Sequence, residues 1–248
     1  GVSFSRNFGI EKSNGEYIFF IDSDDIIAPD CIEILVGLME KYHTNCSIVG
    51  RKSFMSKNDI EYSDKQVELI KGENIIEGLF NKFEGFITGR MYKTEIIKIQ
   101  NLRFKETISM GEDLLFNSYY FMRCDSIAFM SGIKYGYRQH EQSIVNDLSN
   151  LKWFDIIEVY RELIEVFSSN KILINKIHYR YKTALCEAKY RIRKNNLKDT
   201  KLSKRLEKYI LEENKVKLKN IGIKEKIKLI IFICFPKFTM YYKRRMLR

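Results

Sequence analysis

The sequence predicts an α/β domain with a mixed, mostly parallel sheet, followed by a helical region. Residues 17–21 are all aromatic or β-branched and stand directly before acidic residues, which is typical of a strand buried on both faces of an α/β sheet. Strand and helix patterns then alternate, whereas only helical periodicity is found from residue 151 onward. We therefore predict a first domain over residues 1–146, a helical extension over 147–223 and a basic segment over 224–248.

Charge divides the chain in a similar way. The chain has 248 residues, 45% of them hydrophobic, which is enough for a sizeable core. Residues 1–170 carry a net charge of −7 and residues 171–248 a net charge of +18. A basic half favours an anionic partner, either a membrane surface or a nucleic acid. Five cysteines without paired spacing favour reduced thiols over a disulfide framework or a zinc site.

The chain begins at Gly1, and its first residues resemble the interior of a domain. A buried strand at residues 17–21 needs a neighbour on each side, and only one candidate follows it, so we expect a truncated N-terminus. A short helix is predicted up to Lys12. Arg6 lies in its first turns, where a guanidinium suits a phosphate; taken alone, this segment favours an ordinary surface arginine.

Three carboxylates, Asp22, Asp24 and Asp25, follow the predicted strand. Ligands of open α/β sheets bind outside the carboxyl ends of the strands. Clustered acids repel one another, and a divalent cation offsets that repulsion, with Mg²⁺ or Mn²⁺ preferred by oxygen ligands. The alternative is that these residues form a solvated turn or cap the helix that begins near Pro29.

The elements after this cluster are predicted from periodicity. A helix from Pro29 to about residue 45 and a strand over 46–54 imply a right-handed crossover and parallel strands. The remaining predictions for this part of the chain are an irregular stretch over 55–70, a helix over 73–83, a strand or extended segment over 86–92 and a helix over 94–100.

Residues 110–117, with the sequence MGEDLLFN, are the second informative stretch. Gly111 turns the chain, and Glu112 and Asp113 open a helix that runs to about residue 123. One interpretation is that these acids only interact favourably with the dipole at the N-terminus of the helix, as acids do in many proteins. The functional alternative is that one of them is a general base fixed on a rigid element.

Two strands, 126–130 and 133–138, are predicted next, joined by a tight turn at 131–132. The segment that leaves the second strand offers Arg138, His140 and Ser143. A lone histidine is usually structural, but one that follows a strand near carboxylates can bind a metal or a phosphate.

Amphipathic helices are predicted within residues 151–167 and 173–192. The last segment, 224–248, has eight basic residues against one acid. Its apolar run of seven residues is far shorter than the roughly 20 that a membrane span needs. We expect a segment that lies in the membrane interface; the alternative is a helix packed on its own domain.

Taken together, these motifs resemble the family 2 glycosyltransferases, which have a GT-A fold. Residues 1–10 resemble the family segment G-x-S-x-A-R-N-x-G-I, with Ser5 in place of alanine, and residues 15–25 resemble its D-x-D region. Residues 111–113 match its G-E-D motif, and Tyr137, Arg138 and Ser143 resemble the segment that follows. The likeness covers about residues 1–146, in the family's order and spacing.

The resemblance implies an inverting, metal-dependent, hexosyl-type transferase that uses a UDP-sugar and Mn²⁺ or Mg²⁺. It assigns the residues as follows: Asp113 as the catalytic base supported by Glu112, Asp22 and Asp24 toward the ribose and the metal with Asp25 assisting, and Arg6, Arg138 and His140 toward the donor diphosphate. The family's base-binding segment is not present before Gly1, so we expect the chain by itself to be inactive.

The resemblance and the basic segment together predict a role in bacterial cell-surface polysaccharide synthesis. We expect a saccharide or lipid-linked acceptor and a cytoplasmic enzyme held at the inner face of the cell membrane by residues 224–248, with no nucleic-acid partner. One alternative is a binding module without catalysis, for membranes or nucleic acid. The other is a haloacid dehalogenase-type phosphohydrolase, which would not explain Arg6 or residues 111–113.

Overall fold

The computed structural model describes residues 1–139, 151–197, 200–219 and 222–234. The chain divides into two compact units, residues 1–141 and 142–248. The predicted boundary at residue 146 lies within 140–150, outside the described residues. Each unit is considered separately below.

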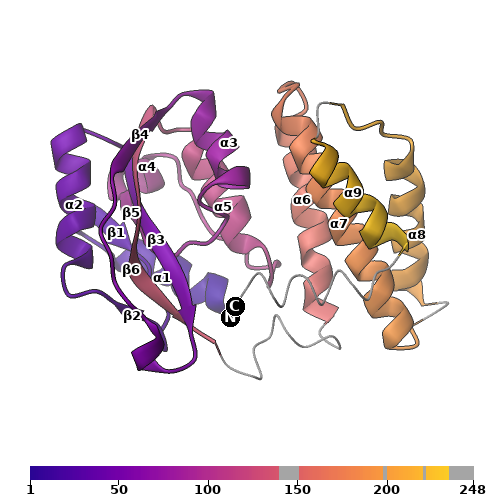
Figure 1. Cartoon of the computed structure of the whole chain (residues 1–248), viewed down its shortest axis with the longest axis horizontal. Coiled ribbons are helices and arrows are strands. Elements are labelled where there is room, and N and C mark those ends of the chain that lie inside the picture. The colour runs from indigo at the N-terminus through magenta and orange to yellow at the C-terminus, as the bar shows by residue number, and fades with distance from the viewer. Residues whose placement is uncertain (140–150, 198–199, 220–221, 235–248) are drawn as a thin grey trace. The chain divides into compact units, whose positions relative to one another are not determined.

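The first unit is built around one mixed sheet (Figure 1). Its strand order is β1-β5-β3-β6-β2, and β4 also pairs with β6. The strands are β1 (Tyr17–Phe19), β2 (Ile26–Ile27), β3 (Cys46–Phe54), β4 (Val67–Lys71), β5 (Arg90–Lys93) and β6 (Ser126–Arg138). The mixed sheet is confirmed, but only the β3–β6 pairing is parallel, and the other four described pairings are antiparallel.

Helices cover both faces of this sheet (Figure 1). The helices are α1 (Val2–Lys12), α2 (Cys31–Tyr42), α3 (Glu73–Asn81), α4 (Thr94–Ile99) and α5 (Glu112–Phe121), with a 3₁₀ turn, η1 (Lys57–Asp59). On one face Leu35 and Met39 of α2 pack on Val49 of β3 and Met130 of β6. The other face has an aromatic layer, in which Phe104 stacks on Phe116 with ring centroids 4.2 Å apart.

The strand after the N-terminal helix differs from its prediction. β1 ends at Phe19 and pairs antiparallel with β5, and only Ile18 of its three residues is buried. Since β5 lies between β1 and β3, these two strands share a direction without being neighbours. Phe20, just beyond β1, packs edge-on against Phe104 in the aromatic layer. The apolar pattern of residues 17–21 therefore arises from two causes, which are formation of β1 and packing of Phe20 in the aromatic layer.

Two further predictions for the sheet were wrong. Residues 126–138 form one continuous strand, β6, without a turn at 131–132. The register with β3 shifts there because Gly50 lies against the bulge: a Cβ on Gly50 would be 2.4 Å from the Ser131 carbonyl oxygen. The stretch predicted as irregular contains β4, which pairs antiparallel with residues 126–130. Pairing with a distant strand, rather than local sequence, decided both outcomes.

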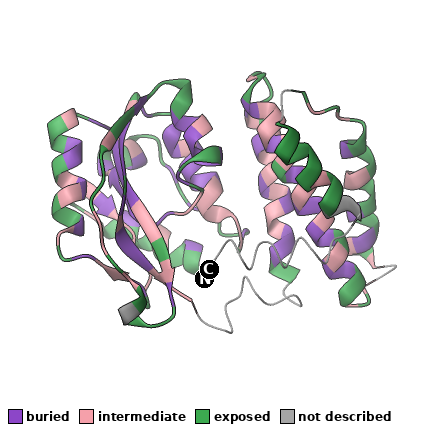
Figure 2. Ribbon diagram, in the orientation of Figure 1, coloured by how far each residue is buried: buried purple, intermediate pink, exposed green. Residues whose placement is uncertain are grey.

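The second unit is helical, as predicted. It contains η2 (Leu151–Phe154), α6 (Asp155–Val166), α7 (Leu173–Lys194), α8 (Lys201–Asn214) and α9 (Ile223–Cys234). The residues of α9 up to Ile231 are exposed except for the half-buried Leu229 (Figure 2). Of the helices that the structure describes, none combines the length and the apolar character needed to pass through a bilayer.

Candidate active site

Four predicted site residues from three separate segments meet in the first unit. Arg6 of α1 has both Nη atoms engaged by carboxylates. Its Nη1 lies 2.5 Å from Asp113 Oδ1 and 3.1 Å from Glu112 Oε1, and its Nη2 lies 3.3 Å from Asp22 Oδ1. The Arg6 side chain is 11% exposed. One guanidinium therefore links the first turn of α5 to the acidic segment after β1.

The backbone at the start of α5 fixes the two acids there. Gly111 precedes the helix with φ +90°, a left-handed conformation that a side chain would strain. Glu112 and Asp113 then occupy the first turn, where their carboxylates point at Arg6. The second oxygen of Asp113 accepts a hydrogen bond from the Ile87 backbone N–H at 3.1 Å.

Burial dominates the electrostatics of Asp113. Its side chain is 20% exposed, and loss of hydration raises its pKa to about 7. The charge of Glu112 acts in the same direction, whereas Arg6 and the Ile87 N–H lower the pKa and only partly offset burial. Asp113 is therefore a carboxyl group that gains and loses a proton near neutral pH, as a general base for a hydroxyl requires.

Asp25 differs from its two acidic neighbours. It is 9% exposed, one of its oxygens accepts a hydrogen bond from the Tyr135 hydroxyl at 2.6 Å, and the other accepts one from the Arg138 backbone N–H at 2.8 Å. Burial raises the pKa of Asp25. Both Asp25 oxygens thus bond to β6, and its assistance in metal binding stays a prediction.

Asp22 and Asp24 are more exposed than Asp25. Asp24 is exposed, and the Asp22 side chain is 41% exposed with one oxygen on Arg6. They lie in a turn closed by the Asp25 N–H and the Asp22 carbonyl, 3.1 Å apart, which agrees with the alternative that these acids form a turn. No group of three or more acidic, histidine or cysteine side chains in the described part of the chain is arranged to hold a metal ion.

Arg138 also lies at this turn. Its Nε donates to the Asp24 carbonyl oxygen at 2.9 Å, and its guanidinium lies over the Phe54 ring at 5.1 Å. His140 and Ser143 lie outside the described residues. The structure thus brings together Arg6, Asp22, Glu112 and Asp113, with Asp24, Asp25 and Arg138 in the adjoining turn.

Sequence reasoning missed the residues that hold the loop 83–87 beside Asp113. Nη2 of the buried Arg90 donates to the Phe83 and Glu84 carbonyls. Asn117, one turn after Asp113, donates to the carbonyls of residues 85 and 86, each at 3.0 Å. The Tyr92 hydroxyl lies 3.3 Å from the Ile87 carbonyl and 2.7 Å from Asn117 Oδ1. The only signal in the sequence was a polar residue within the apolar face of a predicted helix.

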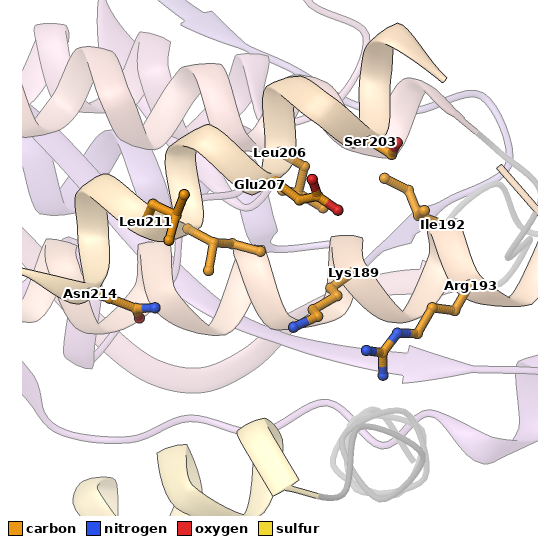
Figure 3. A pocket seen from close by; sticks show the side chains of 9 residues that line it. Lys189, Ile192, Arg193, Ser203, Leu206, Glu207, Leu211 and Asn214 are labelled. Atoms are coloured by element: carbon orange, nitrogen blue, oxygen red, sulfur yellow. The ribbon is translucent and has the colours of Figure 1, made fainter. Parts of the chain in front are cut away.

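A separate groove of about 650 Å³ lies in the second unit, between α7 and α8 (Figure 3). Lys189 and Arg193 of α7 and Glu207 and Leu211 of α8 are among its lining residues. It contains no cluster of acids comparable with that around Arg6. We therefore place the candidate active site at the Arg6 cluster and not at this groove.

Comparison with known proteins agrees with the motifs. Residues 1–99 match the family model "Glycosyl transferase family 2". The chain is 26% identical over 155 residues to glycosyltransferase GlyA of Streptococcus pneumoniae, which covers 58% of this chain and 22% of that protein. It is 19% identical over 183 residues to the poly(ribitol-phosphate) beta-N-acetylglucosaminyltransferase TarS of Staphylococcus aureus, covering 68% of this chain and 29% of that one. The chain thus spans less than a third of either relative.

The fold has a solved counterpart. The crystal structure of S. aureus TarS 1-349 in complex with UDP-GlcNAc aligns with a TM-score of 0.53 and 15% identity, over 81% of this chain and 57% of that one. At this identity the alignment shows a shared fold alone. The first unit thus has the GT-A type of glycosyltransferase fold, as predicted.

Proposed function

We propose that the first unit of this chain is a family 2 glycosyltransferase and carries the acceptor side and part of the donor side of an inverting transferase. The reaction would move a sugar from a nucleotide-sugar to an acceptor hydroxyl. The observation that carries this proposal is Asp113: a half-buried carboxyl that is held by Arg6 and by the Ile87 N–H and has its pKa raised to about 7.

Asp113 would act as the general base. Its carboxylate accepts the proton of the acceptor hydroxyl while the oxygen attacks the anomeric carbon from the face opposite the leaving diphosphate. Glu112 and Arg6 would set the position and basicity of Asp113, because both contact the same cluster. A single displacement of this kind inverts the anomeric configuration.

The donor side would be the turn at residues 22–25. Asp22 and Asp24 would hold Mg²⁺ or Mn²⁺, with the donor phosphates supplying the remaining oxygens. When bound, such a metal stabilises negative charge on the leaving diphosphate. Asp25 would keep the turn attached to β6 through Tyr135, and Arg138 beside Asp24 would approach the diphosphate.

The relatives suggest which substrates to test. A similar structure was solved with UDP-GlcNAc, and one relative is named for transfer to poly(ribitol phosphate). UDP-GlcNAc with Mn²⁺ is therefore the first donor we would test, and a cell-surface polymer the first acceptor. Synthesis of a bacterial surface polysaccharide or teichoic acid is the pathway class that we propose.

The decisive test is Asp113→Asn in the whole protein that contains this sequence, measured by release of UDP from UDP-GlcNAc and by donor affinity. Loss of a general base should lower turnover by about 10²–10⁴-fold. Donor affinity should change less than about twofold, because Asp113 is expected to contact the acceptor. Asp125→Asn is the matched control, since Asp125 is an exposed carboxylate in the same unit.

Equal loss of donor binding in the Asp113 variant would contradict its role as base. Turnover within about tenfold of the unchanged chain would contradict it as well. A fall in turnover of similar size in Asp125→Asn would point to general electrostatics instead.

A second proposal concerns α9: we infer that it docks the protein on an anionic membrane surface. Ile223, Ile227 and Ile230 recur at helical spacing and are 76%, 52% and 59% exposed. Lys224, Lys226 and Lys228 lie between them. Exposed apolar side chains beside lysines are typical of interfacial helices, and the placement would be at the inner face of the cell membrane.

Cosedimentation with phosphatidylglycerol vesicles tests this proposal. We expect the Ile227→Asp, Ile230→Asp double variant to bind at least about tenfold more weakly, because each buried isoleucine contributes about 1.5–3 kcal/mol. Ile172→Asp, which also alters an exposed isoleucine of the second unit, should bind as before. Unchanged vesicle binding by the double variant, or tighter binding to duplex DNA at matched salt, would contradict the membrane role.

A further inference from the structure

Arg51 of β3 is held between two aromatic rings. Its guanidinium carbon lies 3.3 Å from the centroid of the Phe86 ring and 4.8 Å from that of Tyr137. The Arg51 side chain is 16% exposed. Stacking of this kind fixes the plane of a guanidinium and leaves its N–H edges free to bind.

The guanidinium of Arg51 makes no hydrogen bond to any residue that the structure describes, although it carries five N–H donors. Its one described ion pair is with Glu84, 3.8 Å away, whose side chain is 71% exposed. An exposed pair at this distance contributes little and is readily displaced. Burial lowers the pKa of Arg51, but a guanidinium remains charged at any physiological pH.

Arg51 adjoins two elements of the candidate active site, β6 and the loop before Ile87. In the sheet it stands beside Tyr135, whose hydroxyl donates to Asp25. On its other side, Phe86 immediately precedes Ile87, whose N–H donates to Asp113. Through Phe86, Arg51 therefore adjoins the loop that holds the proposed base, whereas Arg138 lies at the turn proposed for the donor.

The loop that carries Phe86 is firmly held. Every carbonyl from residue 83 to residue 87 lies within hydrogen-bond reach of a buried side chain, namely Arg90, Asn117 or Tyr92. Such a loop positions the Phe86 ring, and with it Arg51, before any ligand arrives. A preformed site avoids the entropic cost of ordering flexible side chains on binding.

We propose that Arg51 binds an oxyanion of the acceptor, a phosphate or carboxylate group, next to the hydroxyl that Asp113 deprotonates. The proposal rests on the proposed function for its assignment to the acceptor. The planar fork of Arg51 matches the two oxygens of such a group, and Glu84 would move aside into solvent. It predicts that acceptors with an anionic group close to the reacting hydroxyl are preferred over neutral sugars.

The test is a binding titration followed by NMR of the backbone amide signals of residues 84–87, using glycerol 3-phosphate as the probe and glycerol as its neutral counterpart. Arg51→Gln should bind glycerol 3-phosphate at least about tenfold more weakly, as expected for loss of a charge-assisted contact. Arg51→Lys should lie between, because it keeps the charge but loses the fork. Lys52→Gln, which removes an exposed charge one residue away, should bind as the unchanged chain does.

UDP titrations and the unfolding temperature of each variant complete the design. UDP affinity should be unchanged in Arg51→Gln, and equal losses for UDP and glycerol 3-phosphate would overturn the assignment to the acceptor. Wild-type affinity of Arg51→Gln or Arg51→Lys for glycerol 3-phosphate would overturn the site itself, as would wild-type binding of glycerol equal to that of glycerol 3-phosphate. Because no turnover is needed, failure of Asp113→Asn to lose activity would refute the proposed base without altering these results.

Discussion

Each unit contains a compact charged cluster, and the two clusters have opposite composition. In the second unit one buried carboxylate, Glu213, is approached by two bases: His178 Nδ1 lies 2.9 Å from its Oε1, and Lys182 Nζ lies 3.5 Å from the same atom. In the first unit a single guanidinium, Arg6, serves three carboxylates. The Glu213 side chain is 5% exposed, whereas Asp22 in the first cluster is 41% exposed.

The difference separates a structural cluster from a functional one. Glu213 is contacted by the positive charge of Lys182 and by a His178 ring nitrogen, so burial of its charge is compensated, and Lys182 also donates to its backbone carbonyl at 2.6 Å. Around Arg6, three carboxylates share one positive charge. The pKa of Asp113 rises to about 7, so this carboxyl takes up a proton more readily than an ordinary aspartate. A group that is incompletely neutralised can exchange a proton at neutral pH, which is what a base must do.

Of the changes to the two clusters, replacement of Arg6 should have the largest effect on turnover. In Arg6→Gln the pKa of Asp113 should rise further, since Arg6 lowers it. The acidic limb of the pH–rate profile should move to higher pH, and turnover at pH 7 should fall at least about tenfold, combining lost basicity with lost positioning. The measurement is the rate of UDP release from UDP-GlcNAc across pH 5 to 9.

The free energy of unfolding should also depend on pH through the pKa of Asp113, and the sign of this dependence can be predicted. The pKa of Asp113 in the folded chain, about 7, lies above its unfolded value of 3.8, so the folded state binds more protons between these limits. Stability from this group is therefore lost as pH rises from about 4 to 7, and in Arg6→Gln the loss extends to higher pH. Glu112→Gln is the matched control with the opposite sign, because Glu112 raises the pKa of Asp113. The interpretation fails if both variants move the acidic limb in the same direction.

Glu213→Gln should have a smaller effect, confined to stability. The substitution keeps the shape of the side chain but leaves His178 and Lys182 without their carboxylate, at a cost of about 1–3 kcal/mol in the free energy of unfolding. Urea unfolding measures this cost. Donor affinity and turnover of the folded variant should match those of the unchanged chain. A tenfold loss of turnover in folded Glu213→Gln would remove the distinction between the two clusters.

Local sequence was sufficient to predict the helices and the acidic residues of the cluster around Arg6. The helix α7 and the first turn of α5 were predicted from periodicity and from Gly111, because helix contacts lie within four residues of one another. The acids after β1 and at α5 were found from composition and motif alone. The family resemblance assigned Arg6 to the same site, but its ion pairs with Glu112 and Asp113 were not predicted, since these partners lie more than 100 positions away.

By itself, then, the sequence determined the α/β and helical division, the strand β3, the charge asymmetry and the acids of the site. Tertiary structure decided that β1 pairs antiparallel with β5, that β6 is continuous, and that Asp25 is bonded to the chain on both oxygens. It also decided the positions of Asn117 and Arg51. Strand partners and buried hydrogen bonds join residues distant in sequence, and no local pattern specifies which distant group will be the partner.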